Sequence, residues 1–228
     1  MKTVTFKTGI IFSVLLALGA TTGCATKTTH TTLTPETVTS FNSQYNGVKH
    51  TLVVGNFENR SDYARGLFSS GGDPLGSQAK TVLKTHLQQT NHFKVMDRDN
   101  NNNLAQEAQH LKQAQKITGA RYAVSGAVTE FGRKEVGDRQ LFGLAGRGKQ
   151  QIAYSKVQLN VIDVLSSEII YTSQGAGEYA LSEREVLGFG SNAGYDSTLN
   201  GKVLDLAIRE AVNTFVRDLD NGRVSIAP

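Results

Sequence analysis

Apolar side chains recur along this chain with two periods, one of about 3.6 residues and one of two residues. The first period predicts helices and the second predicts strands with one buried face. The expected strands cover residues 49–57, 92–97, 121–131 and 152–163, and a fifth strand begins at residue 168. The expected helices cover residues 73–89, 102–118 and 199–219. This order predicts an α/β (α+β) domain, with a mixed β-sheet of about five strands and three helices.

The same patterns predict which side chains are buried. The continuous apolar run Leu52-Val53-Val54 predicts a first strand that is covered on both faces. The expected buried stripe of the second helix consists of Leu104, Ala108, Leu111 and Ile117. Gly119 is expected to end that helix. The later strands are expected to bury Tyr122, Val124, Val128, Ala153, Val157, Leu159 and Val161, and the last helix to bury Leu199, Val203, Leu206, Ala207, Ala211 and Phe215.

Two stretches, residues 132–151 and 175–195, do not fit a compact domain of this class. In the second stretch, a turn at Glu183–Glu185 gives two strands of about nine residues, each with its larger apolar groups on one face. This length and alternation are typical of a transmembrane β-hairpin with interfacial aromatic side chains. The candidate membrane-facing residues are Tyr179, Leu181, Leu187, Phe189 and Tyr195. The alternative is an ordinary hairpin that packs one face on the helices, which is the more common arrangement.

The first stretch predicts a second extended hairpin, with its turn at Gly137–Asp138. Four basic residues, Arg133, Lys134, Arg147 and Lys149, lie where a membrane strand would have few charges on its lipid face. A glycine-rich surface loop is the alternative interpretation.

The N-terminus carries the pattern of an export signal. Lys2 and Lys7 precede an apolar run over residues 8–20, and small residues lead to Cys24, the one cysteine of the chain. We expect a signal peptide over residues 1–23, lipidation of Cys24, a flexible tether over 24–47, the domain over 48–222 and a C-terminal tail over 223–228. An ordinary cleaved signal peptide is the alternative. The apolar run is too short for a spanning helix, which needs about 20 residues.

Composition narrows the function classes. The formal net charge of +4 is too small to indicate a nucleic-acid partner. The scattered histidines and the lone cysteine give no metal-ligand spacing, and the chain has no nucleotide-binding or nucleophile motif. We therefore expect no catalytic residues, no metal, no cofactor and no enzyme activity.

Several segments across the domain resemble the corresponding segments of one protein family. They are the strand and following helix Val54–Phe57 and Ser77–Leu83, the strand Ala120–Val128, and the segments Val157–Val164 and Ser167–Ile170. Over about residues 48–220, this order of elements resembles the curli secretion channel family, CsgG and its relatives.

The resemblance implies an outer-membrane lipoprotein with its domain on the periplasmic side, joined in a homo-oligomeric ring. Two hairpins from each copy would close a transmembrane β-barrel, through which a surface fibre or adhesin subunit is exported with accessory envelope proteins. Acylated Cys24 would anchor the protein in the lipid of the outer membrane. The residue after it is Ala25 rather than the Asp that is typical of lipoproteins retained in the inner membrane. A loop after the first strand would narrow the pore, with Tyr63, Phe68 and Ser69 as candidates. The alternative is a periplasmic lipoprotein without a pore that binds or activates an envelope complex.

Overall fold

The computed structural model describes residues 35–41, 43–63, 73–139, 147–185 and 198–226. Residues 36–228 form one compact unit, and the description below concerns this unit. Its elements follow the order β1 (His50–Asn59), α2 (Pro74–Gln89), β2 (Phe93–Met96), α3 (Asn101–His110), β3 (Tyr122–Arg139), β4 (Arg147–Asp163), β5 (Ile169–Glu185) and α4 (Thr198–Asp220). The predicted order of strands and helices is confirmed.

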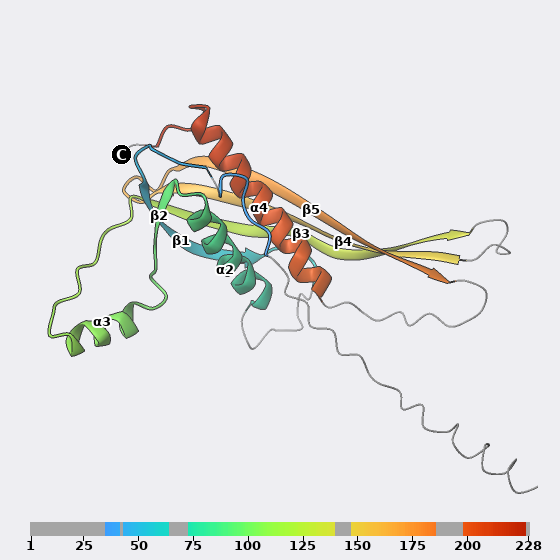
Figure 1. Ribbon diagram of the computed structural model, residues 1–228, viewed down its shortest axis with the longest axis horizontal. Coiled ribbons are helices and arrows are strands. Elements are labelled where there is room, and N and C mark those ends of the chain that lie inside the picture. The colour runs from blue at the N-terminus through green and yellow to red at the C-terminus, as the bar shows by residue number, and fades with distance from the viewer. Residues whose placement is uncertain (1–34, 42, 64–72, 140–146, 186–197, 227–228) are drawn as a thin grey trace, which may run out of the picture. The chain divides into compact units, whose positions relative to one another are not determined.

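The five strands form one mixed sheet in the order β2-β1-β3-β4-β5. β1 pairs in parallel with β2 and β3, whereas β4 pairs antiparallel with β3 and β5. Helices α2 and α4 lie side by side along one face of the sheet (Figure 1). The predicted α+β fold with a mixed sheet is therefore confirmed.

The core lies between this sheet face and the two helices. The side chains predicted to be buried on β3 and β4 are all buried, as are Leu83 and Leu87 of α2. Of the stripe predicted on α4, Val203, Ala207, Ala211 and Phe215 are buried, whereas Leu206 is half-exposed. Phe215 of α4 stacks between Phe93 and Tyr171, with ring centroids 5.2 Å apart in both pairs. Burial of large apolar and aromatic side chains is the main stabilising term of such a layer.

Local chemistry fixes the start of α2. Asp73 is its N-cap residue, and the carboxylate accepts a hydrogen bond from the Gly76 amide at 2.8 Å. Pro74 occupies the first helical position, where its missing N–H costs nothing. The same carboxylate accepts a bond from the Asn59 amide at the end of β1. The cap therefore also joins α2 to the strand beneath it.

Two glycines allow α4 to lie close to β5. A methyl group at Gly175 would collide with the backbone of α4 at Ala207 and Ala211. At Gly177 it would lie 2.7 Å from the carbonyl oxygen of Val203. Small residues on both elements thus set the distance between the helix and this edge strand.

The structure corrects two predictions about burial. In β1, Leu52 and Val54 are buried but Val53 is half-exposed, because helices cover only one face of the sheet. The helix predicted over residues 102–118 ends at His110, and none of its residues is buried. Its apolar stripe was inferred from spacing alone, and spacing does not show whether a partner surface exists.

The two predicted turns within the hairpins are also wrong. β3 continues through Gly137–Asp138 as far as Arg139, and β5 continues through 183–185. Residues 140–146 and 186–197, which follow these strands, lie outside the described residues. Both strands are therefore longer than the alternation of apolar residues indicated.

The end of the predicted tether packs on the domain. Val38 is buried in the core, the Thr39 amide donates to Asn213 at 3.0 Å, and Arg209 forms an ion pair with Glu36. The ring of Tyr45 lies 3.9 Å from that of His92, centroid to centroid. Residues 36–47 therefore belong to the compact unit, as the division of the chain after residue 35 also indicates. Among the described helices, none has the length and apolar character needed to cross a bilayer.

Candidate functional site

A three-stranded extension is the most distinctive feature of the described chain. β1 ends opposite Val128, so beyond that point β3, β4 and β5 continue without it. The β3–β4 ladder has an irregularity between Val128 and Glu130, and from there the ladders run in register as far as Arg139, Arg147 and Glu185, which lie opposite one another. Figure 1 shows these three strands reaching past the ends of α2 and α4. We call residues 131–139, 147–155 and 177–185 the strand extension.

The outer strands of the extension have open edges within the described residues. β5 pairs only with β4, and β3 beyond Val128 pairs only with β4. Backbone N–H and C=O groups on such edges bind water or another strand. The extension therefore offers two edges, one on each side, that can accept an additional strand.

Charged residues are placed on both faces of the extension by its register. One row across the three strands consists of Glu135 on β3, Gln151 on β4 and Leu181 on β5. The next row on the same face pairs Lys149 of β4 with Glu183 of β5. On the other face, Asp138 shares a row with Arg184. Rows two residues apart share a face of the sheet. The predicted membrane-facing position Leu181 therefore shares its face with charged positions.

Two aromatic residues predicted to be functional pack within the domain. Tyr63 lies against Phe131, with ring centroids 4.7 Å apart, and its hydroxyl accepts a bond from Asn200 Nδ2 at 2.9 Å. Lys202 of α4 lies 5.0 Å above the ring of Tyr179. For Tyr179, this is the packing of an ordinary hairpin against a helix.

The other predicted site residues lie outside the described residues. They are Cys24, Phe68, Ser69, Leu187, Phe189 and Tyr195. Their predicted roles in lipidation, in pore narrowing and in contact with lipid stay predictions.

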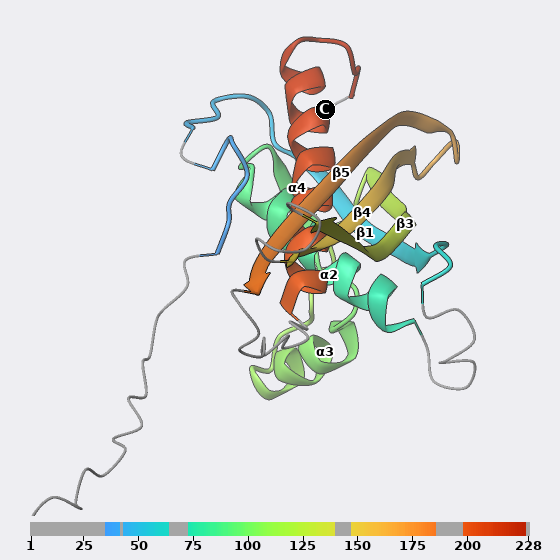
Figure 2. The same ribbon diagram turned by 90° about the vertical axis from the view of Figure 1, so that its right-hand side faces the viewer.

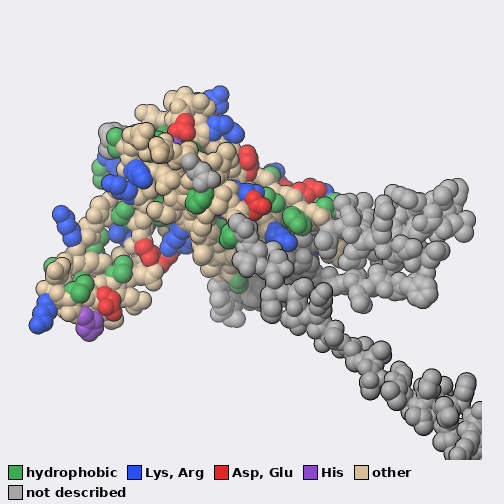
Figure 3. All heavy atoms as spheres, viewed as in Figure 1, with side chains coloured by type: hydrophobic (Ala, Val, Ile, Leu, Met, Phe, Trp, Pro, Cys, Tyr) green, Lys and Arg blue, Asp and Glu red, His purple; other side chains and the backbone are tan. Residues whose placement is uncertain are grey.

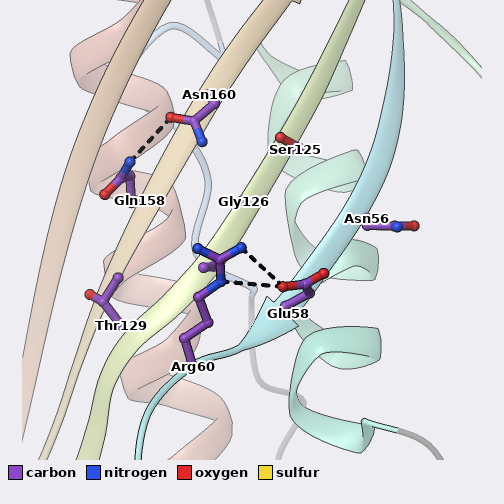
Figure 4. A pocket seen from close by; sticks show the side chains of 9 residues that line it. Asn56, Glu58, Arg60, Ser125, Gly126, Thr129, Gln158 and Asn160 are labelled. Atoms are coloured by element: carbon purple, nitrogen blue, oxygen red, sulfur yellow. Dashed lines mark hydrogen bonds and ion pairs between the residues drawn. The ribbon is translucent and has the colours of Figure 1, made fainter. Parts of the chain in front are cut away.

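The helix-free face of the sheet carries a polar hollow of about 240 Å³ (Figure 4). Its lining of amide, hydroxyl and charged groups consists of Asn56, Glu58, Arg60, Ser125, Gly126, Ala127, Thr129, Gln158 and Asn160. Arg60 pairs with Glu58 at 3.2 Å, and Gln158 Nε2 donates to Asn160 Oδ1 at 3.2 Å. This lining contains no histidine or cysteine that could act as a base or nucleophile at neutral pH. The hollow is suited to exchanging hydrogen bonds with a polar chain.

Two buried histidines were missed by the sequence analysis. His86 Nε2 lies 2.9 Å from Asp205 Oδ1, and His92 Nε2 lies 3.0 Å from Asp220 Oδ1. Both aspartates belong to α4, so the pair with His86 attaches α4 to α2 and the pair with His92 attaches it to the segment just before β2. No local motif surrounds either histidine, and each pairing joins residues more than 100 positions apart. In the described part of the chain, no group of three or more His, Cys, Asp or Glu could hold a metal ion.

An exposed charged cluster joins α2 to the loop before α3. Hydrogen bonds from Lys80 and then Lys84 lower the pKa of Asp99 to about 2. Asp97 pairs with Lys84 at 3.4 Å. These groups are partly exposed and already paired, so the cluster fixes the loop and has no open ligand position.

Comparisons with known proteins identify relatives. The family model described as "Curli production assembly/transport component CsgG" matches residues 38–225. A Neisseria meningitidis serogroup B protein whose name calls it a lipoprotein is 59% identical over 212 residues, which cover 92% of this chain and 95% of that protein.

Solved structures give weaker matches. The PelC dodecamer from Paraburkholderia phytofirmans matches with a TM-score of 0.34 and 14% identity, covering 72% of this chain and 87% of that chain. A lipoprotein from Neisseria meningitidis matches with a TM-score of 0.35 and 11% identity, covering 75% of this chain and 99% of that chain. At these scores the likeness carries no argument about assembly or ligands.

Proposed function

Because this chain belongs to the CsgG family, we propose that it is an outer-membrane lipoprotein whose domains form or support a homo-oligomeric ring on the periplasmic side. Acylated Cys24 anchors each copy in the outer membrane lipid. The ring exports a subunit of a surface fibre or adhesin, together with accessory envelope proteins. It binds and guides the exported chain and catalyses no reaction.

The observation that carries this proposal is the pair of open edges on the strand extension. One edge belongs to β3 beyond Val128 and the other to β5, on opposite sides of the same three strands. Side-by-side copies bring the β3 edge of one copy to the β5 edge of the next. Each junction then hydrogen-bonds backbone groups that a single copy exposes to water, and a closed ring leaves no edge unpaired.

The charges of the extension decide which part of it contacts lipid. A Lys or Arg on the lipid face of a membrane strand costs about 2–4 kcal/mol at the bilayer midplane. We infer that the described extension lies in water, because its register puts Lys149 and Glu183 on one face and Asp138 and Arg184 on the other. In this proposal, lipid contact is made beyond Glu185, by Leu187 and Phe189.

The helix-free face of the sheet suits the exported chain. Next to the polar hollow, Thr172 and Gln174 are exposed on β5, where they pair in register with Asn160 and Gln158 of its lining. Amide and hydroxyl groups replace the water hydrogen bonds of an extended polypeptide at little net gain in free energy. Weak, exchangeable contacts of this kind let a chain slide without being retained.

The test uses the lipidated full chain extracted from membranes. We expect particles of many copies that resist SDS, and conductance steps in planar bilayers. Leu187→Asp and Phe189→Asp should remove the conductance and leave the particle mass unchanged. A wild-type protein that stays monomeric contradicts the proposal, and rings without conductance favour the alternative, a lipoprotein without a pore that binds or activates an envelope complex.

A further inference from the structure

The arm that contains α3 has no partner surface within the described chain. We call residues 101–119 the α3 arm. None of the residues of α3 is buried, and Leu104, Leu111 and Ile117 are exposed, Leu111 by 72%. A helix of ten residues is marginal in water without packing. Its exposed apolar side chains therefore indicate a surface that covers it in the assembled protein.

The turn between β4 and β5 presents a second exposed apolar group. Val164, Leu165 and Ile169 protrude there, and Leu165 is 78% exposed. We call residues 163–169 the β4–β5 corner.

Hydrogen bonds hold this corner in one shape. The Asp163 carboxylate accepts bonds from the Leu165 amide at 2.8 Å and the Ser166 amide at 3.2 Å, and it pairs with Arg121 at 2.7 Å. Ser167 has a positive φ of 61°, which a non-glycine residue adopts only where the surroundings require it. The corner is thus a preformed apolar projection, and little entropy is lost when it binds.

The arm and the corner lie at one end of the sheet but on different sides of the molecule. The arm leads into β3 and the corner follows β4, and these strand ends pair through Tyr122 and Asp163 at the end opposite the strand extension. The arm leaves from β2, which is one edge strand of the sheet, and the corner leads into β5, which is the other. Figures 1 and 2 both show α3 separate from the sheet.

Charges around the two patches are complementary. Lys112 follows Leu111 and Lys116 precedes Ile117 on the arm, whereas Glu168 precedes Ile169 on the corner. Within the described residues, none of these three charged side chains has an ion-pair partner in its own chain. The arm also contains Glu107, so that Glu107, Lys112 and Lys116 together give it a net charge of +1, and Figure 3 shows both basic and acidic side chains there. The arm contains no Trp, Tyr or Phe, which a helix bound to a lipid surface would use.

We propose that the α3 arm of one copy binds the β4–β5 corner of the next copy. The proposal rests on the ring of the proposed function and names a contact that builds it. The contact joins unlike surfaces, so it propagates head to tail and closes into a ring when the rotation permits. It lies at the end of the sheet opposite the extension, so each junction is held at both ends.

Cysteine cross-linking tests the contact. The full-length lipidated chain with both Leu104→Cys and Leu165→Cys should give a covalent ladder of many copies after mild oxidation. Each single variant should give at most dimers, because acylated Cys24 has no free thiol. A double variant that forms no ladder, or single variants that form the same one, overturns the proposal.

Charge and size variants give an independent test. Leu111→Glu and Leu165→Glu should each raise the concentration at which rings half-dissociate by about tenfold or more, because each removes an apolar side chain from the contact. Val48 is 61% exposed and lies outside both patches, so Val48→Glu should leave this half-dissociation concentration unchanged. Lys112→Glu should weaken the ring, and the double variant with Lys112→Glu and Glu168→Lys should regain part of the lost ring stability.

The outcomes separate the two proposals. If the wild type forms rings and both Leu111→Glu and Leu165→Glu form equally stable ones, this contact is overturned and the proposed ring stands. A monomeric wild type overturns both.

Discussion

Gly175→Ala tests the joint between β5 and α4, on which the orientation of the strand extension depends. The added methyl group would overlap the backbone of Ala207 and Ala211 and lie 3.0 Å from Ala211 Cβ. Overpacking costs about 1–3 kcal/mol, and backbone atoms cannot rotate away, so we expect a loss near 3 kcal/mol. For a domain of this size, that lowers Tm by roughly 6–12 °C.

Gly55→Ala in β1 is the matched control. A methyl group there meets its nearest atoms, Val124 O and Ser125 Cβ, at 3.8 and 4.0 Å, which is ordinary contact. Because alanine restricts the unfolded chain, we expect a gain of about 0.4–1 kcal/mol. Thermal and urea unfolding followed by circular dichroism measure both variants. If Gly175→Ala is as stable as the wild type, the close approach of α4 to β5 is refuted.

Three further substitutions test other contacts. Asp99→Asn should reduce the loss of stability that the wild type shows between pH 4 and pH 2. The pKa of Asp99 is lowered to about 2, so its stabilising negative charge is lost as pH falls through that range. At pH 7 the substitution should lower the free energy of unfolding by less than about 1 kcal/mol, as for other exposed ion pairs. Tyr171→Phe removes the bond to Asp218 at 2.8 Å and should cost about 1 kcal/mol in urea unfolding. Burial and that bond raise the pKa of Tyr171, so the wild type should lose this advantage above pH 10 and the variant should not. Tyr63→Phe removes the acceptor for Asn200 and should speed amide exchange at residues 59–63 without changing the global Tm by more than about 2 °C.

The fold could be predicted because its signals are local. Alternation placed Val157, Leu159 and Val161 on one buried face of β4, and Asp73-Pro74 marked the start of α2. These signals depend on neighbouring residues alone, so they can be recognised in a short segment without knowing what the rest of the chain does.

The errors concern features that depend on distant partners. The α3 stripe has helical spacing, but no local signal shows that a single copy leaves Leu111 uncovered. The turn expected at Glu183–Glu185 was inferred from the alternation of apolar residues on either side, yet β4 supplies a partner at each of these positions and the strand continues. The pairs of His86 and His92 with aspartates of α4 could not be found from spacing either, since they exist only once the helix is in place.

Single-particle electron microscopy of the wild-type lipidated protein, extracted from membranes without cross-linker, tests the central claim most directly. We predict closed rings in which neighbouring copies meet through the β3 and β5 edges, with the α3 arm of each copy on the β4–β5 corner of the next. Particles of single copies, under conditions in which the lipid anchor is shown to be present, would contradict the account.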